Sequence, residues 1–302
     1  MKIKTGNSSI KLKMLLVFCV PVFAVSLVIR CIEIATAIDA STGFYIERGF
    51  LAGFFDALII ISCVLIAVCA FLSSESAKIK TTGISSKPLF AVTLVFALSL
   101  FLDCFRSLIR SFSSLSTAAE GSAFKGLMVS GTLPFFIESV FALFSGVYFI
   151  YAASSFKSGK DTAAKHRILA LMPVGWVAFR MVGLFVRKIS FTKVSDLFFE
   201  LIMLGFMIMF FMAFAQITSN VYSEGFSWRI FGFGLPAGLI AAVLNLSRLI
   251  FSIINSSEYI NPNHPFNVTD ILFAAFIFTM CVMILKKKPA QDEQREITDG
   301  CE

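Results

Sequence analysis

The sequence predicts an all-α bundle of transmembrane helices in a polytopic membrane protein. Of the 302 residues, 57% belong to the hydrophobic set and 15% are charged, and the mean hydropathy is +0.85. Soluble domains average about 45–50% apolar and about 25% charged residues. Phe occupies 36 positions, against 5 for Tyr and 2 for Trp. These values exclude a soluble globular enzyme, a disordered protein and a disulfide-rich secreted scaffold.

Eight apolar stretches are long enough to cross a hydrocarbon layer of roughly 30 Å. They are residues 14–36, 51–72, 89–112, 130–153, 167–187, 197–219, 228–254 and 269–286. Turn-forming sequences such as Asp39–Gly43 and Asn261–Pro265 separate them. No connection is long enough for a soluble domain, so residues 1–288 are predicted to form one membrane domain. The short acidic stretch 289–302 is predicted to be a disordered cytoplasmic tail.

The first apolar stretch has two interpretations. It follows four lysines and ends near Ala35-Thr36-Ala37, which resembles the small-residue cleavage site of a signal peptide. The alternative is a retained first helix. The apolar run from Met14 to Ile29 is long for a signal core, and Arg30 fits a pattern repeated in later spans. We therefore expect residues 1–37 to stay attached.

The basic residues are distributed unevenly between the two sides of the predicted bundle. With a cytoplasmic N-terminus, 16 of the 26 Lys and Arg residues fall on the cytoplasmic side, 5 in outer loops and 5 within spans. Cytoplasmic loops of multi-pass proteins carry such an excess. We therefore expect both termini in the cytoplasm and contact with the lipid bilayer. The net charge of +7 is assigned to membrane orientation and not to nucleic-acid binding.

Charged residues recur inside the spans, although a charge at the bilayer centre costs about 2.5–3.5 kcal/mol on insertion scales. Each odd-numbered span has an arginine near its C-terminal end, and each even-numbered span has an acid near its N-terminal end. The arginines are Arg30, Arg106, Arg180 and Arg248, and the acids are Asp56, Glu138, Glu200 and Asp270. In the expected orientation all eight lie in the outer half of the membrane. We expect each arginine to reach a carboxylate.

The order of arginines and acids also indicates an internal duplication, in which residues 155–288 repeat residues 1–154. Phe54-Phe55-Asp56 in the first half matches Phe198-Phe199-Glu200 in the second. An even number of helices in each half predicts a parallel repeat, with its axis along the membrane normal. Chance similarity between Phe-rich helices is the alternative.

The charged layer has a structural and a functional interpretation. It is either a network that fixes helix register, or the lining of an outward-facing vestibule for a polar or charged solute. Asp103, Arg106 and Arg110 share one helix face, and Arg110 is surplus to pairing within hairpins, which suits a carboxylate or phosphate ligand. The candidate ligand-binding residues are Arg30, Asp56, Asp103, Arg106, Arg110, Glu138, Arg180, Glu200, Arg248 and Asp270.

Pro and Gly residues within the spans predict helix kinks and close helix packing. Four prolines predict helix kinks. They are Pro21, Pro134, Pro173 and Pro236. Gly234 and Gly238 have small-xxx-small spacing, which we expect to permit close helix packing within the chain.

Several catalytic motifs are absent from the sequence. Its two histidines, His166 and His264, lie in predicted loops, so there is no HExxH motif and no Ser–His dyad in a span. There is no Walker A motif, and the seven cysteines form no CxxC pair. We therefore expect no catalytic residues, no bound metal and no cofactor, and a protein that is not an enzyme.

The segment Ile38–Tyr45 follows the first span and contains a D-x-x-T-G-F pattern at residues 39–44. It resembles a loop of uncharacterised polytopic membrane proteins from clostridial-type Firmicutes. The resemblance implies a bacterial cytoplasmic membrane and supplies no activity.

The sequence thus favours a transport or solute-binding membrane component for a small polar or anionic solute. The alternatives are a non-catalytic accessory or sensory subunit with a structural charge network, and a membrane enzyme acting on lipid-linked substrates. A water-filled cavity reaching Arg106 and Glu138 would indicate the first, and a closed, fully paired network the second. A cleft open to lipid beside an unpaired carboxylate would indicate the third.

Overall fold

The computed structural model describes residues 5–38, 45–46, 49–73, 86–116, 132–159, 163–186, 195–219, 227–254 and 267–299. These residues form α-helices, two short 3-10 helices and one isolated β-bridge between Ile38 and Tyr45. Eight of the helices are long and apolar enough to cross a membrane. The predicted fold class is confirmed, and the chain is an all-α, multi-pass integral membrane protein.

Each predicted span corresponds to one helix, and most ends are displaced by no more than five residues, although α1 begins nine residues earlier and α9 ends thirteen residues later than predicted. The long helices are α1 (Thr5–Thr36), α2 (Phe50–Leu72), α3 (Lys87–Ser116), α5 (Leu133–Ser158), α6 (Met172–Val186), α7 (Ser195–Thr218), α8 (Ser227–Ile254) and α9 (Val268–Asp299). The 3-10 helices η1 (Ala163–Lys165) and η2 (Leu169–Leu171) precede α6.

Helix α9 extends beyond the predicted last span. It continues to Asp299, so residues 289–299 are helical where the sequence predicts a disordered tail. Ala290, Gln291 and Glu293 are strong helix formers. They prolong a helix that has already formed, so the cost of helix nucleation does not apply to them.

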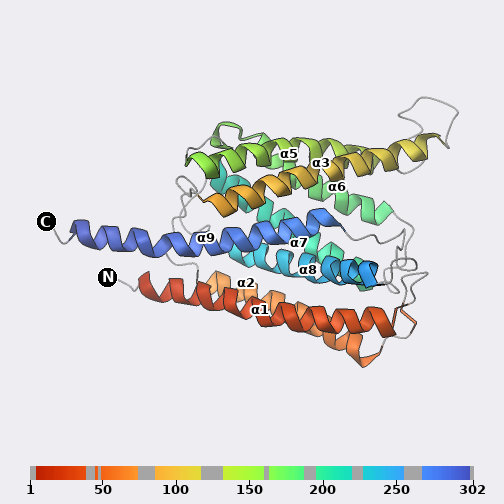
Figure 1. Cartoon of the computed structure of the whole chain (residues 1–302), viewed down its shortest axis with the longest axis horizontal. Coiled ribbons are helices and arrows are strands. Elements are labelled where there is room, and N and C mark those ends of the chain that lie inside the picture. The colour runs from red at the N-terminus through yellow and green to blue at the C-terminus, as the bar shows by residue number, and fades with distance from the viewer. Residues whose placement is uncertain are drawn as a thin grey trace.

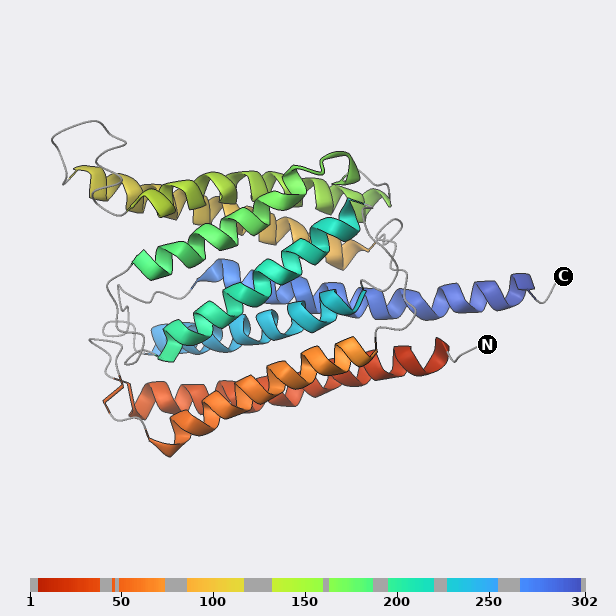
Figure 2. The ribbon, with the colours of Figure 1, turned by 180° about the vertical axis from the view of Figure 1, so that it is seen from behind.

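The helices form three layers, which can be followed in Figures 1 and 2. α1 and α2 make one outer layer, α3, α5 and α6 make the other, and α7, α8 and α9 lie between them. α8 is the most buried candidate span and packs against α1, α2, α7 and α9. Both ends of the chain lie at the same end of the bundle, as an even number of spans requires.

Phenylalanine rings from four helices meet at the centre of the bundle. Phe96 of α3 lies 4.8 Å from Phe149 of α5 and 5.6 Å from Phe276 of α9, measured between ring centroids. Phe149 in turn lies 6.0 Å from Phe211 of α7. All four side chains are buried. Such ring pairs contribute about 0.5–1.5 kcal/mol beyond their buried area, which gives the high Phe content a structural role.

Glycines let neighbouring helices pack closely against two further phenylalanine rings, those of Phe141 and Phe210. A Cβ atom added at Gly175 of α6 would lie 2.4 Å from the ring of Phe141 on α5. One added at Gly234 of α8 would lie 3.0 Å from the ring of Phe210 on α7 and 3.3 Å from Ile277 on α9. Small residues permit this close packing between membrane helices. The expected role of Gly234 within the chain is confirmed.

Two of the four span prolines, Pro21 in α1 and Pro236 in α8, lie inside helices. Pro134 and Pro173 instead occupy the first turns of α5 and α6. The kinks predicted at these two positions are wrong, because a first-turn residue needs no N–H for the helix ladder. Both helices begin later than the predicted spans, which places these prolines at helix starts.

The predicted duplication is matched by some helix contacts and not by others. α1 packs on α2 as α6 packs on α7, and α3 packs on α5 as α8 packs on α9. α7 also packs against α8, whereas its equivalent, α2, packs against α1 and α8. The duplication of residues 1–154 as 155–288 therefore stays a prediction.

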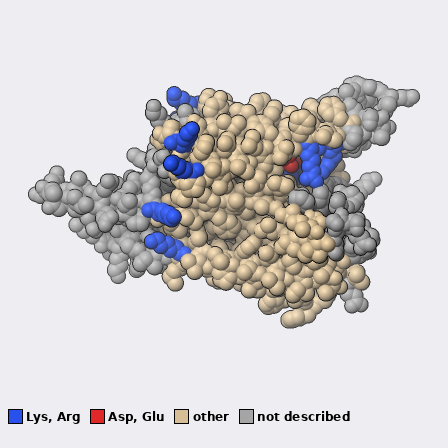
Figure 3. Space-filling model, viewed as in Figure 1, with Lys and Arg blue, Asp and Glu red and all other residues tan. Residues whose placement is uncertain are grey.

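The outer face of the bundle is apolar between its two ends. Large exposed side chains include Val20 on α1, Ile61 and Val64 on α2, and Leu102 and Phe105 on α3. Figure 3 shows this broad apolar surface, with Lys and Arg side chains at the end where the termini lie and a further charged patch near the opposite end. The distribution matches a surface that contacts lipid.

Candidate functional site

Charged side chains gather at the end of the bundle opposite the termini. They come from the C-terminal parts of α1, α3, α6 and α8 and from the N-terminal parts of α5, α7 and α9. Asp196 lies in the first turn of α7 and Asp270 in the first turn of α9, where the positive end of the helix dipole favours a carboxylate. The predicted charged layer thus lies at one end of the bundle.

Arg180 of α6 is bound to Asp270 of α9. Its Nη1 and Nη2 atoms each donate a hydrogen bond to a different carboxylate oxygen, both at 2.6 Å. Asn245 of α8 donates to the same carboxylate at 3.4 Å, and its own side-chain oxygen accepts from the backbone N–H of Asn267 at 2.8 Å. A buried carboxylate with these donors holds α6, α8 and α9 together.

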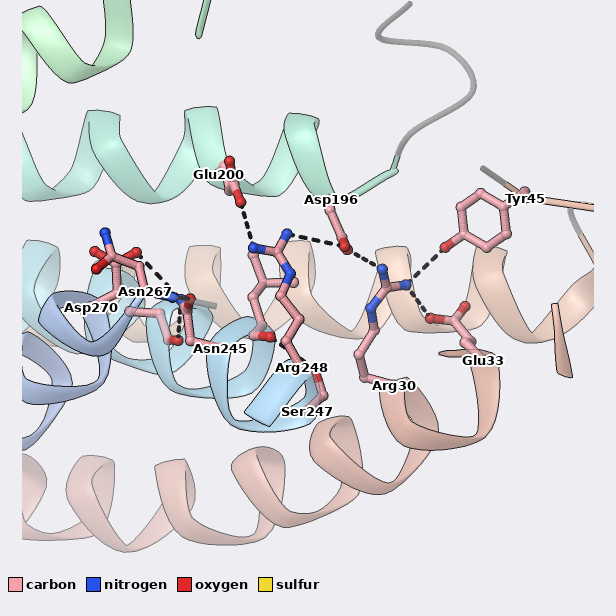
Figure 4. A network of polar contacts seen from close by, with 12 residues as sticks. Arg30, Glu33, Tyr45, Asp196, Glu200, Asn245, Ser247, Arg248, Asn267 and Asp270 are labelled. Carbon is pink, nitrogen blue, oxygen red and sulfur yellow. Dashed lines mark hydrogen bonds and ion pairs between the residues drawn. The ribbon is translucent and has the colours of Figure 1, made fainter. Parts of the chain in front are cut away.

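A second set of ion pairs joins α1, α7 and α8, as Figure 4 shows. Arg248 of α8 donates to Glu200 at 2.8 Å and to Asp196 at 3.1 Å, both on α7. Asp196 also accepts a hydrogen bond from Arg30 of α1. Asp196 therefore bridges two arginines from different helices.

Arg30 is the α1 member of this network, and its side chain is 1% exposed. Its Nη1 donates to Glu33 at 2.7 Å and to the hydroxyl oxygen of Tyr45 at 2.9 Å. Its guanidinium also lies over the ring of Phe55 on α2, 5.4 Å from the ring centroid. These contacts lie within the α1–α2 hairpin, and the hydrogen bond from Arg30 to Asp196 joins that hairpin to α7.

α3 contributes three charged residues, Asp103, Arg106 and Arg110, to the same region of the bundle. Asp103 accepts a hydrogen bond from the indole N–H of Trp176 at 3.0 Å, and the Arg110 guanidinium lies over the ring of Phe135, 5.4 Å from its centroid. Arg106 is exposed and, within the described part of the chain, forms no hydrogen bond or ion pair. Arg106 interacts electrostatically with the Asp103 carboxylate, and direct or water-bridged pairing of Arg106 with a carboxylate stays a prediction.

These groups surround one pocket, and eight of the ten predicted site residues line it. The eight are Asp103, Arg106, Arg110, Glu138, Arg180, Glu200, Arg248 and Asp270. Arg30 and Asp56 are not among the lining residues. Arg30 instead lies behind Asp196, in the buried network of Figure 4.

The pocket is polar and small. Its lining contains four arginines and four acids, so its formal charges balance. The space open to the centre of a water molecule is about 70 Å³. One water needs roughly 10–15 Å³ on this measure, and pockets for drug-sized ligands hold about 300–1,000 Å³. The pocket therefore accommodates several waters or a small solute group, with guanidinium and carboxylate groups available to it.

Sequence reasoning did not select several residues that hold this site together. Asp196, Tyr45, Trp176, Asn245 and Asn267 all make the contacts described above. The spacing of Asp196 and Glu200 at i and i+4, and of Asn245 and Arg248 at i and i+3, does predict that each pair shares a helix face pointing into the bundle. Tyr45 lies in a connection that carries no periodic pattern, so no comparable signal marked it.

No protein-family model, curated protein or solved structure matches this chain. The D-x-x-T-G-F loop at residues 39–44 lies outside the described residues. Among the described residues, no group of three or more His, Cys, Asp or Glu side chains is arranged to hold a metal ion. The pocket and its charges are therefore the features of this chain that bear on function.

Proposed function

We propose that this membrane protein binds a small polar or anionic solute in the pocket, as a transport or solute-binding component of the membrane. The observation that carries the proposal is a cavity with room for several waters, lined by both Arg106 and Glu138. A network with a purely structural role needs no such cavity, since every charge is best satisfied by a protein partner.

The arginines of the pocket differ in how far their donors are already used. Arg180 and Arg248 donate to carboxylates, whereas Arg106 is exposed and forms no ion pair with any described residue. A guanidinium offers five N–H donors in a planar fork that matches a carboxylate or phosphate. Arg106 is therefore the residue that we assign to direct solute contact.

The acids of the lining limit the charge of the solute. With four arginines balanced by four acids, a solute carrying one negative group adds a single excess charge to the pocket. Asp103 and Glu138 can accept hydrogen bonds from a donor elsewhere on the same solute. A compound with one anionic group and at least one donor group fits this lining best.

We also propose that the pocket faces away from the cytoplasm, with both termini inside. The excess of Lys and Arg at the termini end supports this orientation. The buried Phe cluster around Phe96 and Phe149 lies between the pocket and the termini end, which supports access from the outer side. The loop resemblance supports a bacterial cytoplasmic membrane.

A thermal-shift screen of the purified protein with small anions, amino acids and nucleosides tests the proposal. A compound at 100 times its Kd should stabilise the folded state by about 2.7 kcal/mol. The same compound should stabilise Lys165→Gln, which loses one exposed charge outside the pocket, and should not stabilise Arg106→Gln. An undiminished shift in Arg106→Gln would place the solute elsewhere.

A non-catalytic accessory or sensory subunit is the second candidate. It is favoured by the ion pairs of Arg30, Arg180 and Arg248, which account for three of the predicted arginines without any ligand. In that case no compound in the screen shifts the unfolding temperature, and Arg106→Gln behaves like Lys165→Gln throughout. Neither candidate assigns a catalytic role to these residues.

A further inference from the structure

A groove between α1 and α9 opens on the outer surface at the end of the bundle where the termini lie. Six residues line it: Lys13, Leu16 and Val17 of α1, and Val282, Leu285 and Lys286 of α9. The space in the groove that is open to the centre of a water molecule is about 440 Å³, and the lining contains no acid. It lies at the opposite end of the bundle from the proposed solute pocket.

The two helices contribute the same pattern in opposite chain directions. Lys13 precedes Leu16 and Val17 by three and four residues, and Lys286 follows Val282 by four residues. Because α1 runs away from this end of the bundle and α9 runs toward it, both lysines lie at the rim. At a rise of about 1.5 Å per residue, Leu16, Val17 and Val282 lie about 4.5–6 Å deeper, and Leu285 lies close to the level of Lys286. The groove therefore has a cationic rim and an apolar interior.

No acidic side chain in these parts of the chain competes for the lysines. The first acid in the sequence is Glu33, and none occurs between Asp270 and Asp292. Lys11, Lys287 and Lys288 adjoin the two rim lysines in sequence. Both rim lysines are exposed.

We infer that this groove binds one anionic phospholipid, with its phosphate between Lys13 and Lys286 and an acyl chain along the aliphatic residues. A soluble anion would use the lysines and leave the apolar wall without a role. A zwitterionic lipid would use the wall, and its own cationic group would offset the attraction of the lysines. Basic pockets between membrane helices favour anionic headgroups for this reason. The inference does not depend on the proposed solute function.

Native mass spectrometry of the full-length protein tests the inference by titration with phosphatidylglycerol or phosphatidylcholine of identical acyl chains. Phosphatidylglycerol should bind more tightly. Each lysine near the headgroup contributes about fivefold in affinity, so Lys13→Gln with Lys286→Gln should weaken phosphatidylglycerol binding by about 25-fold. The matched control, Lys87→Gln with Lys165→Gln, removes two exposed charges from other helices and should bind as the parent does.

A second variant separates the apolar wall from the charge. Val282→Trp keeps both lysines and fills part of the groove, so it should also weaken phosphatidylglycerol binding. Glycerol phosphate, which carries the anion without acyl chains, should not displace the lipid. Equal affinity for the two lipids would overturn the inference, as would an equal loss in the control variant. Displacement by glycerol phosphate would show that the groove selects soluble anions.

Discussion

Arg180 on α6 and Asp270 on α9 form a two-point ion pair across helices that are not neighbours in the sequence, with both N–O distances at 2.6 Å. Asp270 is 2% exposed and the Arg180 side chain 15%. A planar guanidinium facing a carboxylate in this way fixes the relative orientation of the two helices. The pair also forms part of the pocket wall, so the geometry of the pocket depends on it.

Removing one member of this pair should be costly. Asp270→Ala leaves Arg180 without its carboxylate in a largely buried position, and we expect a loss of about 3–5 kcal/mol in unfolding free energy. Asp270→Leu combined with Arg180→Leu should recover part of that loss, because neither charge is then left alone. A double-mutant cycle measured by denaturation in micelles gives the coupling. Strictly additive losses would mean that the two groups do not interact.

Asp196 should matter more to stability than its neighbour Glu200. Asp196 accepts from both Arg30 and Arg248, whereas Glu200 accepts from Arg248. Asp196→Asn removes the negative charge between two buried guanidinium groups, so it should lower the unfolding temperature further than Glu200→Gln. Equal decreases in the two variants would contradict the bridging role of Asp196.

The contact between Gly175 and Phe141 predicts a sharp effect of a single methyl group. Gly175→Ala places a Cβ atom where the ring lies 2.4 Å away, and overpacking of this kind costs about 1–3 kcal/mol. Gly205→Ala is the matched control, because nothing lies within 4 Å of its added Cβ. That control should be neutral or stabilising, by up to about 1 kcal/mol from helix propensity. Thermal unfolding in detergent compares them, and similar unfolding temperatures would refute the close helix packing.

Reporter fusions test the proposed orientation. Fusions after Lys160 and after Lys288 should report the cytoplasm, and a fusion after Asn261 should report the outside, because basic loops remain in the cytoplasm. A fusion after Lys288 that reports the outside would reverse the assigned direction of the pocket. Intact mass measurement in parallel shows whether residues 1–37 stay attached.

The sequence predicts the charged layer, but it does not predict which arginine contacts which carboxylate. The alternation of arginines and acids predicts that each arginine reaches a carboxylate and does not name the partner. The structure pairs Arg180 with Asp270 and Arg248 with Glu200. Arg30 reaches Asp196, 166 residues away in the chain. Helices joined by a short loop are neighbours, but which faces meet depends on the packing of all eight.

The sequence by itself determined the eight spans and the gathering of the charged layer at one end of them, because the cost of placing a charge or an apolar stretch in a bilayer acts on each segment separately. The tertiary structure decided which carboxylates Arg30, Arg180 and Arg248 meet. It also brought residues from α3, α5, α6, α7, α8 and α9 around one cavity, and left Arg106 exposed within that cavity. These outcomes follow from long-range packing of Phe rings and glycines between helices, and local sequence patterns do not encode which helices will meet.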